Sequence, residues 1–411
     1  MIIKRTKIQP SVLISIFLML YMSRDTVLFG TNGNGIMKLV GYVAYGGIAL
    51  YWMLKGKVAK KLFDVALFFI ALGGITLITT GVNIKIFYLF LLVVLAAFFC
   101  SNVKFEVFAE AYQKIMLFLS IYSIVAYALY EIAYPIVMRF PIFRNEANVA
   151  FINLFFDMPM VKVPYVEHRS FGIFREPGVY MIFLTLALMF ELFFVKNESN
   201  KKTVAHIVIY VIALVLTLST AGFIVMALVL ILYLFFGSNN QNHKNLKMVV
   251  FIAFFVGALW LLFDKTMFEV VFGKLMSDNY SKASRMESVY SNIRMITDNI
   301  EHFFTGLGFS FVEENFSYYS TDSSMGDNTN TIFRVFSTYG FLYISVLMAL
   351  WFKFFAKLKN AFVVLCLFGT FCLCLFNESL IVNVMLYIIA FYSLNTDLVV
   401  KKEILESDHL V

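Results

Sequence analysis

Charged residues are scarce in this chain of 411 residues: Asp, Glu, Lys and Arg together make up 14% of it. A soluble domain has about 25% charged residues and about 45–50% apolar residues, whereas hydrophobic residues make up 61% of this sequence. The composition therefore excludes an ordinary soluble domain. The net charge of +7 is spread over many connections, and because no compact basic region is present, we expect no nucleic-acid partner.

Cysteine is also rare. The four cysteines all lie within or at the end of apolar blocks, so we expect no disulfide. The Cys372-x-Cys374 spacing directs the two thiols to different sides of a helix, which argues against a metal pair.

Long apolar blocks make up most of the chain. A helix of about 20 apolar residues crosses about 30 Å of hydrocarbon, and backbone groups in lipid must be satisfied within the segment. We therefore expect an all-α, polytopic integral membrane protein with a single membrane domain over residues 1–411 and about twelve transmembrane helices. The expected helices cover residues 9–23, 36–54, 62–80, 84–100, 115–137, 177–195, 203–220, 222–237, 248–264, 331–352, 360–376 and 379–396.

Lysine and arginine divide between the two faces of this topology. Most lysines lie in alternate short connections, such as 55–61 and 353–359, together with Lys4 and Lys7 near the N-terminus. The positive-inside rule places these segments in the cytoplasm, so we expect both termini there. The opposite face contains eight of the nine arginines: Arg24, Arg139, Arg144, Arg169, Arg175, Arg285, Arg294 and Arg334.

The external arginines fall mostly in two long loops, at about 138–176 and about 265–330. Guanidinium is planar, permanently charged and forked, so it pairs with phosphate oxygens two at a time. Because the orientation rule does not call for arginine on this face, its accumulation there predicts a bound anion.

The first loop ends at the expected start of a helix. Pro177 suits the first helical position, which puts Glu176 at the positive end of the helix with Arg169 and Arg175 just outside it, a favourable place for an anion. Alternatively, Arg175 and Glu176 only anchor the helix at the lipid headgroups. His168 is an exposed loop histidine, and such residues are more often bystanders than general bases. The apolar stretch 149–156 is too short to cross a membrane, so it lies along the interface or packs on the helices.

The second loop contains an expected amphipathic helix. Its apolar stripe recurs at helical spacing, with Arg285 and Arg294 on opposite edges of the stripe. The stripe consists of Met286, Val289, Tyr290, Ile293, Ile296 and Ile300, and we expect it to pack on the membrane domain. The polar stretch that follows, about 318–330, suits carbohydrate, although a solvated loop has much the same composition.

Four motifs in order over about 169–340 resemble the O-antigen ligase and polymerase (Wzy-type) family of bacterial surface polysaccharide assembly. They are Arg169-x-x-Gly172-x-x-x-Glu176-Pro177-Gly178; Leu216-Thr217-Leu218-Ser219-Thr220-Ala221-Gly222; Arg285 before Gly306-x-Gly308; and Asn328 ahead of a helix that contains Gly340. The resemblance implies metal-independent, cofactor-free glycosyl transfer on the external face of the bacterial inner membrane. The implied partners are an undecaprenyl pyrophosphate-linked oligosaccharide, membrane lipid and a chain-length regulator.

By this resemblance, positioned guanidiniums stabilise the pyrophosphate leaving group as the glycosidic bond breaks. The expected catalytic residues are Arg169, Arg175, Glu176 and Arg285, and the expected substrate-binding residues are Gly172, Arg294, Asp327 and Asn328. Glu176 would orient the arginines or the acceptor, whose hydroxyl needs a base or a hydrogen-bond partner within about 3 Å.

Two departures bear on the activity. Ligases of the family tend to carry a histidine where this chain has Asp327, which favours a polymerase, and the short hairpin motif often has an arginine where Thr220 and Ala221 stand here. The alternatives are a ligase, which passes the glycan to lipid A-core, and a flippase or transporter for the lipid-linked unit. A transporter tends to place ionisable residues near the bilayer midplane, whereas the apolar blocks of this chain contain few of them.

Overall fold

The computed structural model describes residues 8–30, 35–145, 148–161, 169–195, 200–237, 247–248, 251, 280–321 and 328–395. The N-terminal half contains α1 (Pro10–Tyr21), α2 (Gly35–Lys55), α3 (Lys60–Thr80), α4 (Ile84–Asn102), α5 (Phe105–Ile132), α6 (Tyr134–Val137), β1 (Ile142–Arg144), β2 (Ala150–Ile152) and α7 (Pro177–Met189), which continues as a π-helix over Phe190–Phe194. The rest contains α8 (Asn200–Leu216), α9 (Thr220–Phe236), α13 (Tyr280–Asp298), α14 (Gly308–Tyr319), α15 (Thr331–Phe355), α16 (Ala361–Asn377) and α17 (Val384–Tyr392).

Within the described residues, six helices are long and apolar enough to cross a membrane: α2, α3, α4, α5, α7 with its π-helical continuation, and α15 with the 3-10 turn that follows it. The shorter apolar helices are α1, α9 and α16. A mostly helical membrane protein is therefore what the structure supports. The expected block over 248–264 lies almost wholly outside the described residues.

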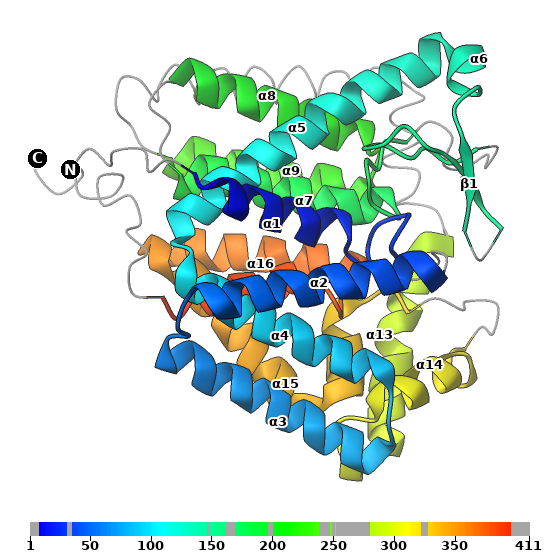
Figure 1. Cartoon of the computed structure of the whole chain (residues 1–411), viewed down its shortest axis with the longest axis vertical. Coiled ribbons are helices and arrows are strands. Elements are labelled where there is room, and N and C mark those ends of the chain that lie inside the picture. Colours follow the sequence, from blue (N-terminus) through cyan, green and yellow to red (C-terminus); the bar gives the residue numbers. More distant parts are fainter. Residues whose placement is uncertain are drawn as a thin grey trace, which may run out of the picture.

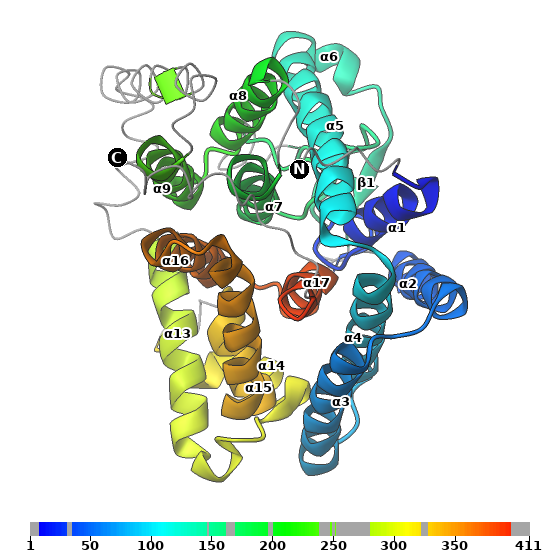
Figure 2. The same cartoon turned by 90° about the vertical axis from the view of Figure 1, so that its left-hand side faces the viewer.

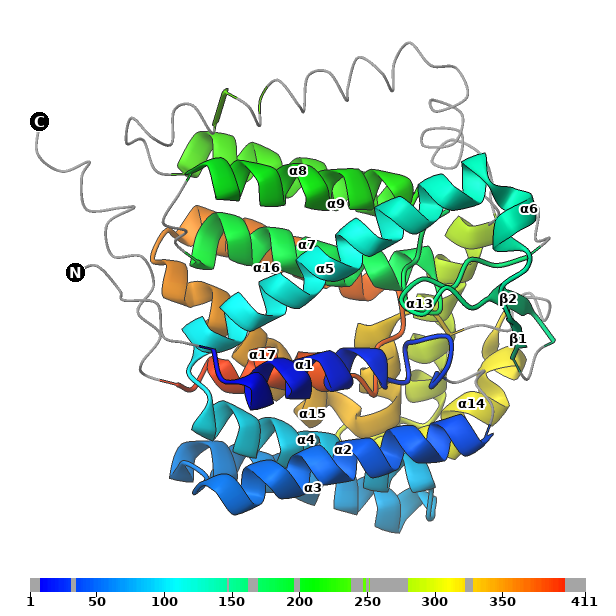
Figure 3. The same cartoon turned by 45° about the horizontal axis from the view of Figure 1, so that its top comes forward.

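The helices run between two ends of the molecule (Figures 1 and 3), with α6, β1 and α14 at one end and the α2–α3 and α4–α5 connections at the other. Viewed along the helices, α17 lies near the centre, between α4, α7 and α15 (Figure 2). All residues of α17 are buried. The interior is therefore organised around the last described helix.

The expected transmembrane helix over 379–396 is wrong in its first part. The chain is non-helical from Glu378 to Asn383, and α17 has only nine residues. At 1.5 Å per residue it is about 13 Å long, less than half of the hydrocarbon thickness. Asn383 begins the helix by accepting a hydrogen bond from the Met385 N–H at 2.9 Å. Glu378 and Ser379 precede this helix in non-helical backbone, so their polar groups can bond to other segments.

A break in α15 at Gly340 allows another segment to cross it. Gly340 has φ 85°, a conformation that costs a non-glycine residue about 1–3 kcal/mol. The freed backbone groups bond instead to the segment after α13: the Leu307 N–H donates to the Ser337 carbonyl and the Phe341 N–H donates to the Phe303 carbonyl, both at 2.8 Å. A Cβ on Gly340 would lie 2.3 Å from the carbonyl oxygen of Phe304. The Gly306-x-Gly308 segment and Gly340 therefore lie at the same place, where two backbone segments cross in close contact.

The apolar stretch of the first loop forms part of a small hairpin, so the chain is not helical throughout. Strands β1 and β2 pair antiparallel, with Ile142 opposite Ile152. Ile152 and Leu154 are buried against Ala126 and Tyr130 of α5. The stretch therefore packs on α5, which is one of its two expected placements.

The orientation of α13 reverses the expected one. Much of the predicted apolar stripe is exposed, including Met286, Tyr290 and Ile293, although Ile296 is buried. The buried face is mainly polar and comprises Ser284, Glu287, Ser288, Ser291, Asn292 and the apolar Met295. The predicted helix does form and packs on α15, but through its polar face and not through the apolar stripe. The polar side chains bond to the chain before α15, and these contacts determine which face lies inward.

Candidate functional site

The predicted helix start at Pro177 is confirmed and forms the centre of the candidate site. Glu176 precedes the helix in extended backbone with φ −151° and ψ 151°, and Pro177 occupies the first turn of α7. The N–H groups of a first helical turn lack helical partners and carry partial positive charge. The helix start lies at the end of the bundle that also contains β1 and α14 (Figure 3).

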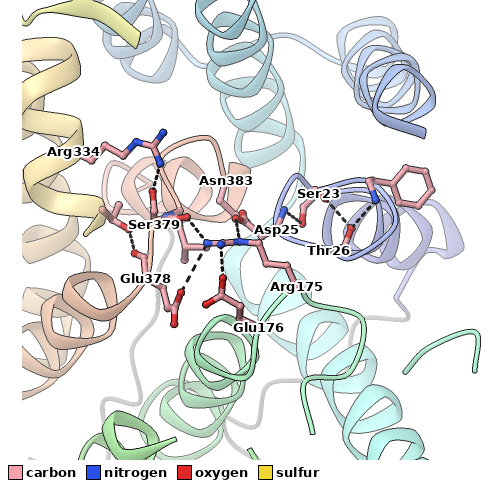
Figure 4. Close-up of polar contacts among 12 residues, drawn as sticks. Ser23, Asp25, Thr26, Arg175, Glu176, Arg334, Glu378, Ser379 and Asn383 are labelled. Atoms are coloured by element: carbon pink, nitrogen blue, oxygen red, sulfur yellow. Dashed lines mark hydrogen bonds and ion pairs between the residues drawn. The ribbon is translucent and has the colours of Figure 1, made fainter. Parts of the chain in front are cut away.

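The Arg175 side chain joins three segments at this point (Figure 4). Its Nη1 lies 2.8 Å from Glu176 Oε1, and its Nη2 donates to the Ser379 carbonyl at 3.0 Å. Its Nε lies 3.6 Å from Asp25 Oδ1, and Nη2 lies 3.9 Å from Glu378 Oε2. An arginine that only anchored a helix at lipid headgroups would point outward. Arg175 instead points into the protein.

Asp25 fixes the position of Arg175 from the α1–α2 connection. Its Oδ2 accepts a hydrogen bond from Asn383 Nδ2 at 2.6 Å, and its carbonyl accepts from the Arg175 N–H at 2.9 Å. Burial raises the pKa of Asp25, although the charges of Arg175 and Arg24 and the Asn383 hydrogen bond lower it. The N-terminal connection, the entry to α7 and the start of α17 therefore meet at one carboxylate.

Glu378 supplies a second buried carboxyl group from the segment between α16 and α17. Its side chain is 5% exposed, and its carbonyl accepts a hydrogen bond from Thr331 Oγ1. A Cβ on Gly178 would lie 1.9 Å from Glu378 Oε1, so the glycine of the Pro177-Gly178 motif makes room for this carboxyl group. Burial, followed by the negative charge of Glu176, raises the pKa of Glu378 to about 8.

Two further predicted arginines approach the same carboxyl groups. Arg169 Nε donates to the Thr217 carbonyl at 2.9 Å, in the hairpin between α8 and α9. Arg285 Nε donates to the Asn377 carbonyl at 3.4 Å, next to Glu378. Burial lowers the pKa of Arg169, while the negative charges of Glu378 and Glu176 raise it and Arg285 lowers it further.

The structure thus brings together the four residues predicted as catalytic: Arg169, Arg175, Glu176 and Arg285. We call these four residues together with Glu378 the arginine–carboxyl cluster. Their chemical roles stay predictions. The segment 216–222 between α8 and α9 positions Arg169, because the Thr217 carbonyl accepts a hydrogen bond from this side chain.

The predicted substrate-binding residues are dispersed. Gly172 adopts φ 55°, and its carbonyl accepts from the Met158 N–H at 3.1 Å, which gives the glycine a conformational role. Arg294 is exposed and bonds to the Tyr319 carbonyl at 3.3 Å, about 13 Å along α13 from Arg285. Asp327, like His168, lies outside the described residues.

Asn328 is tied to the protein rather than presented to solvent. It exchanges two hydrogen bonds with Asn292 of α13, at 3.0 Å and 3.1 Å. Asn292 also accepts from the hydroxyl of Ser337. These bonds account for the buried polar face of α13.

A second cationic group adjoins the cluster: Arg334, one of the eight external arginines, was not among the predicted site residues, and neither was Glu378. Arg334 of α15 donates to Ser379 Oγ at 2.9 Å and to Glu313 at 2.8 Å, and Glu313 also pairs with Lys85 of α4. Ser379 therefore contacts Arg334 through its hydroxyl and Arg175 through its carbonyl (Figure 4). The sequence feature that could have indicated Glu378 is the polar pair Asn377 and Glu378, which lies between two apolar blocks.

Among the described residues, no three His, Cys, Asp or Glu side chains are grouped as a metal site would need. Comparison of the sequence with protein-family models and with curated proteins finds no match. The resemblance to the O-antigen ligase and polymerase family therefore stays an interpretation of the motifs.

Proposed function

We propose that this protein polymerises lipid-linked oligosaccharide repeat units of an O-antigen or similar surface polysaccharide. In this reaction it transfers glycan from undecaprenyl pyrophosphate to a sugar acceptor on the external face of the bacterial inner membrane. The observation that carries the proposal is the placement of Arg169, Arg175 and Arg285 around the carboxyl group of Glu378, beside the start of α7.

The charge of this cluster suits a diphosphate. The guanidiniums of Arg169, Arg175 and Arg285 all interact with the charge of Glu378, and burial raises the pKa of this carboxyl group to about 8, which favours its neutral form. Forked guanidinium donors match phosphate oxygens, and the first turn of α7 adds partial positive charge. The cluster lies at one end of the helices (Figure 3), where the headgroup of a lipid-anchored donor would be held.

Such a site would lower the barrier by stabilising the leaving group. A bond forms between the acceptor oxygen and the anomeric carbon of the donor sugar while the bond from that carbon to the diphosphate oxygen breaks. The diphosphate leaves with the electron pair and gains negative charge, which fixed guanidiniums stabilise better in the transition state than in the ground state. The acceptor hydroxyl loses its proton to a base as the new bond forms.

One observation favours a transporter as the second candidate. Glu191 is fully buried in the π-helical end of α7, where Gln113 Nε2 donates to it at 2.7 Å and His206 Nδ1 lies 3.4 Å away. Ionisable residues inside a membrane protein often mark transport pathways, and π-helical turns are frequent at functional sites. A flippase for the lipid-linked repeat unit would use such a group.

The test is the surface-glycan ladder of a deletion strain that expresses single variants. We expect Arg169→Ala, Arg175→Ala and Arg285→Ala each to reduce long-chain glycan about 100-fold or more, as removal of one transition-state donor typically does. Lysine at these positions should restore only part of the activity, because it keeps the charge and loses the fork. Arg144→Ala is the matched control, since Arg144 is exposed on the β1–β2 hairpin.

The ladder also separates the alternatives. The empty strain should show surface glycan of one repeat unit if the protein is a polymerase. No attached glycan would identify a ligase, and no repeat unit outside the inner membrane would identify a flippase. Full-length glycan from all three alanine variants, with protein amounts equal to wild type, would rule out the proposed site.

A further inference from the structure

The arginine–carboxyl cluster contains two acidic side chains where an anion is proposed to bind. Glu176 and Glu378 both approach Arg175, at 2.8 Å and 3.9 Å. Two carboxylates beside a diphosphate would repel it, since like charges about 4 Å apart interact by about 4 kcal/mol even at the effective dielectric constant of a protein surface. The protonation state of these carboxyl groups therefore decides whether the cluster accepts an anion.

Two carboxyl groups approach the one guanidinium of Arg175 here, and a carboxyl group can donate a hydrogen bond only when it is protonated. Burial and the neighbouring charge of Glu176 favour a proton on Glu378. Glu378 is the more enclosed of the two, with 5% of its side chain exposed against 46% for Glu176. Its carboxyl group lies over Gly178 in the first turn of α7, where a Cβ would fill its place.

The charged groups around Glu378 come from three segments. Arg175 and Glu176 lie at the entry to α7, Arg169 lies in the segment before it, and Arg285 extends from α13. Burial and the charge of Glu176 raise the pKa of Glu378 to about 8, against the opposing effects of Arg175 and Arg285.

We propose that Glu378 binds the diphosphate as a neutral acid, donating its O–H to a phosphate oxygen while the three arginines pair with the remaining oxygens. The inference rests on the proposed function, because it names a further binding residue of the same site. When the diphosphate enters, the O–H of Glu378 turns to a phosphate oxygen, and no covalent bond changes. Ionised Glu378 would offer no hydrogen and would repel the ligand.

The test measures binding of farnesyl diphosphate to the purified full-length protein in detergent between pH 7.5 and 9.5. The second pKa of a phosphate monoester is about 6, so the charge of the probe is nearly constant over this range. For the wild type we expect the affinity to fall increasingly above pH 8, approaching tenfold for each pH unit. The sign follows from a raised pKa: the binding form is present below it and is lost as the pH rises through it.

Variants at position 378 isolate the group. Glu378→Ala should weaken binding at pH 7.5 about tenfold or more, because a hydrogen bond to a charged group is lost. Glu378→Gln should recover most of that loss and remove the pH dependence, because its amide N–H donates and does not titrate. Glu314→Gln, which changes an exposed carboxyl group on α14, should keep the wild-type profile.

Three outcomes would contradict the inference. A wild-type affinity that stays flat from pH 7.5 to 9.5 would overturn it while leaving the diphosphate site intact. Binding by Glu378→Asp but not by Glu378→Gln would mean that the carboxylate itself is required. No binding of farnesyl diphosphate by well-folded wild type, judged by gel filtration and melting temperature, would overturn both this inference and the proposed function.

Discussion

A single glycine shows how the candidate site depends on distant residues. Gly178 follows Pro177 in a motif that marks a helix start, yet the reason for glycine is the carboxyl group of Glu378, two hundred positions further along the chain. A side chain at position 178 would displace that group. The position of the Glu378 carboxyl group therefore depends on glycine at position 178.

Asp25 offers a test of how Arg175 is positioned. We expect Asp25→Asn to lower the free energy of unfolding by about 1–3 kcal/mol, because the hydrogen bond from Asn383 loses its charged acceptor and Arg175 loses a buried ion-pair partner. The expected change in melting temperature can be measured in detergent. Long-chain glycan should fall as well, since Nε of Arg175 loses its carboxylate at 3.6 Å.

The reciprocal exchange separates these two effects. In the double variant Asp25→Asn with Asn383→Asp, the hydrogen bond again has a charged acceptor, with donor and acceptor reversed. The new carboxylate at position 383 can still accept from the Met385 N–H as a helix cap. We expect the melting temperature to recover and the glycan ladder to stay short, because the negative charge has moved away from Arg175. Recovery of both would show that the charge of Asp25 has no role at the site.

At the scale of elements, the break in α15 makes a clear prediction. Gly340→Ala should destabilise the protein by about 1–3 kcal/mol for the positive φ alone, and further because the new Cβ would lie 2.3 Å from the Phe304 carbonyl oxygen. The matched control is Gly369→Ala in α16, where a Cβ meets open space. Equal melting temperatures for the two variants would mean that the crossing at Gly340 does not form.

The reversed face of α13 can be tested in the same way. Asn292 is buried and bonds to Asn328 and Ser337, whereas its neighbour Ile293 is exposed. We expect Asn292→Ala to lower the free energy of unfolding by about 1–3 kcal/mol, because buried partners are left unsatisfied, and Ile293→Ala to change it by about 0.5 kcal/mol or less. A larger loss of stability for Ile293→Ala than for Asn292→Ala would indicate that the apolar stripe of α13 is the buried face.

At the scale of the whole molecule, the two ends should face different compartments. Tyr318 of α14 is 81% exposed at the end that contains the arginine–carboxyl cluster, and Lys57 is exposed in the α2–α3 connection at the other end. We expect a membrane-impermeant maleimide to label Tyr318→Cys in intact spheroplasts and Lys57→Cys only after lysis. The unmodified protein measures the background from its native cysteines. The reverse pattern would place the arginines in the cytosol and remove the proposed function.

The sequence by itself determined the helical membrane class, the start of α7 at Pro177 and the four residues that meet there. These features depend on local composition: apolar length sets a spanning helix, and proline sets a helix start. Gly306, Gly308 and Gly340 could be recognised in the sequence as parts of motifs, but the sequence did not indicate that their segments contact each other.

Only the tertiary structure decided which groups complete the site and which side of α13 faces inward. Asp25, Arg334, Glu378 and Asn383 come from segments too far apart for any local period to relate. Periodicity also failed for α13, because much of its apolar stripe is exposed and its polar face is buried. There the hydrogen bonds of Glu287, Ser288 and Asn292 decided the orientation, since buried polar groups are stable only with partners.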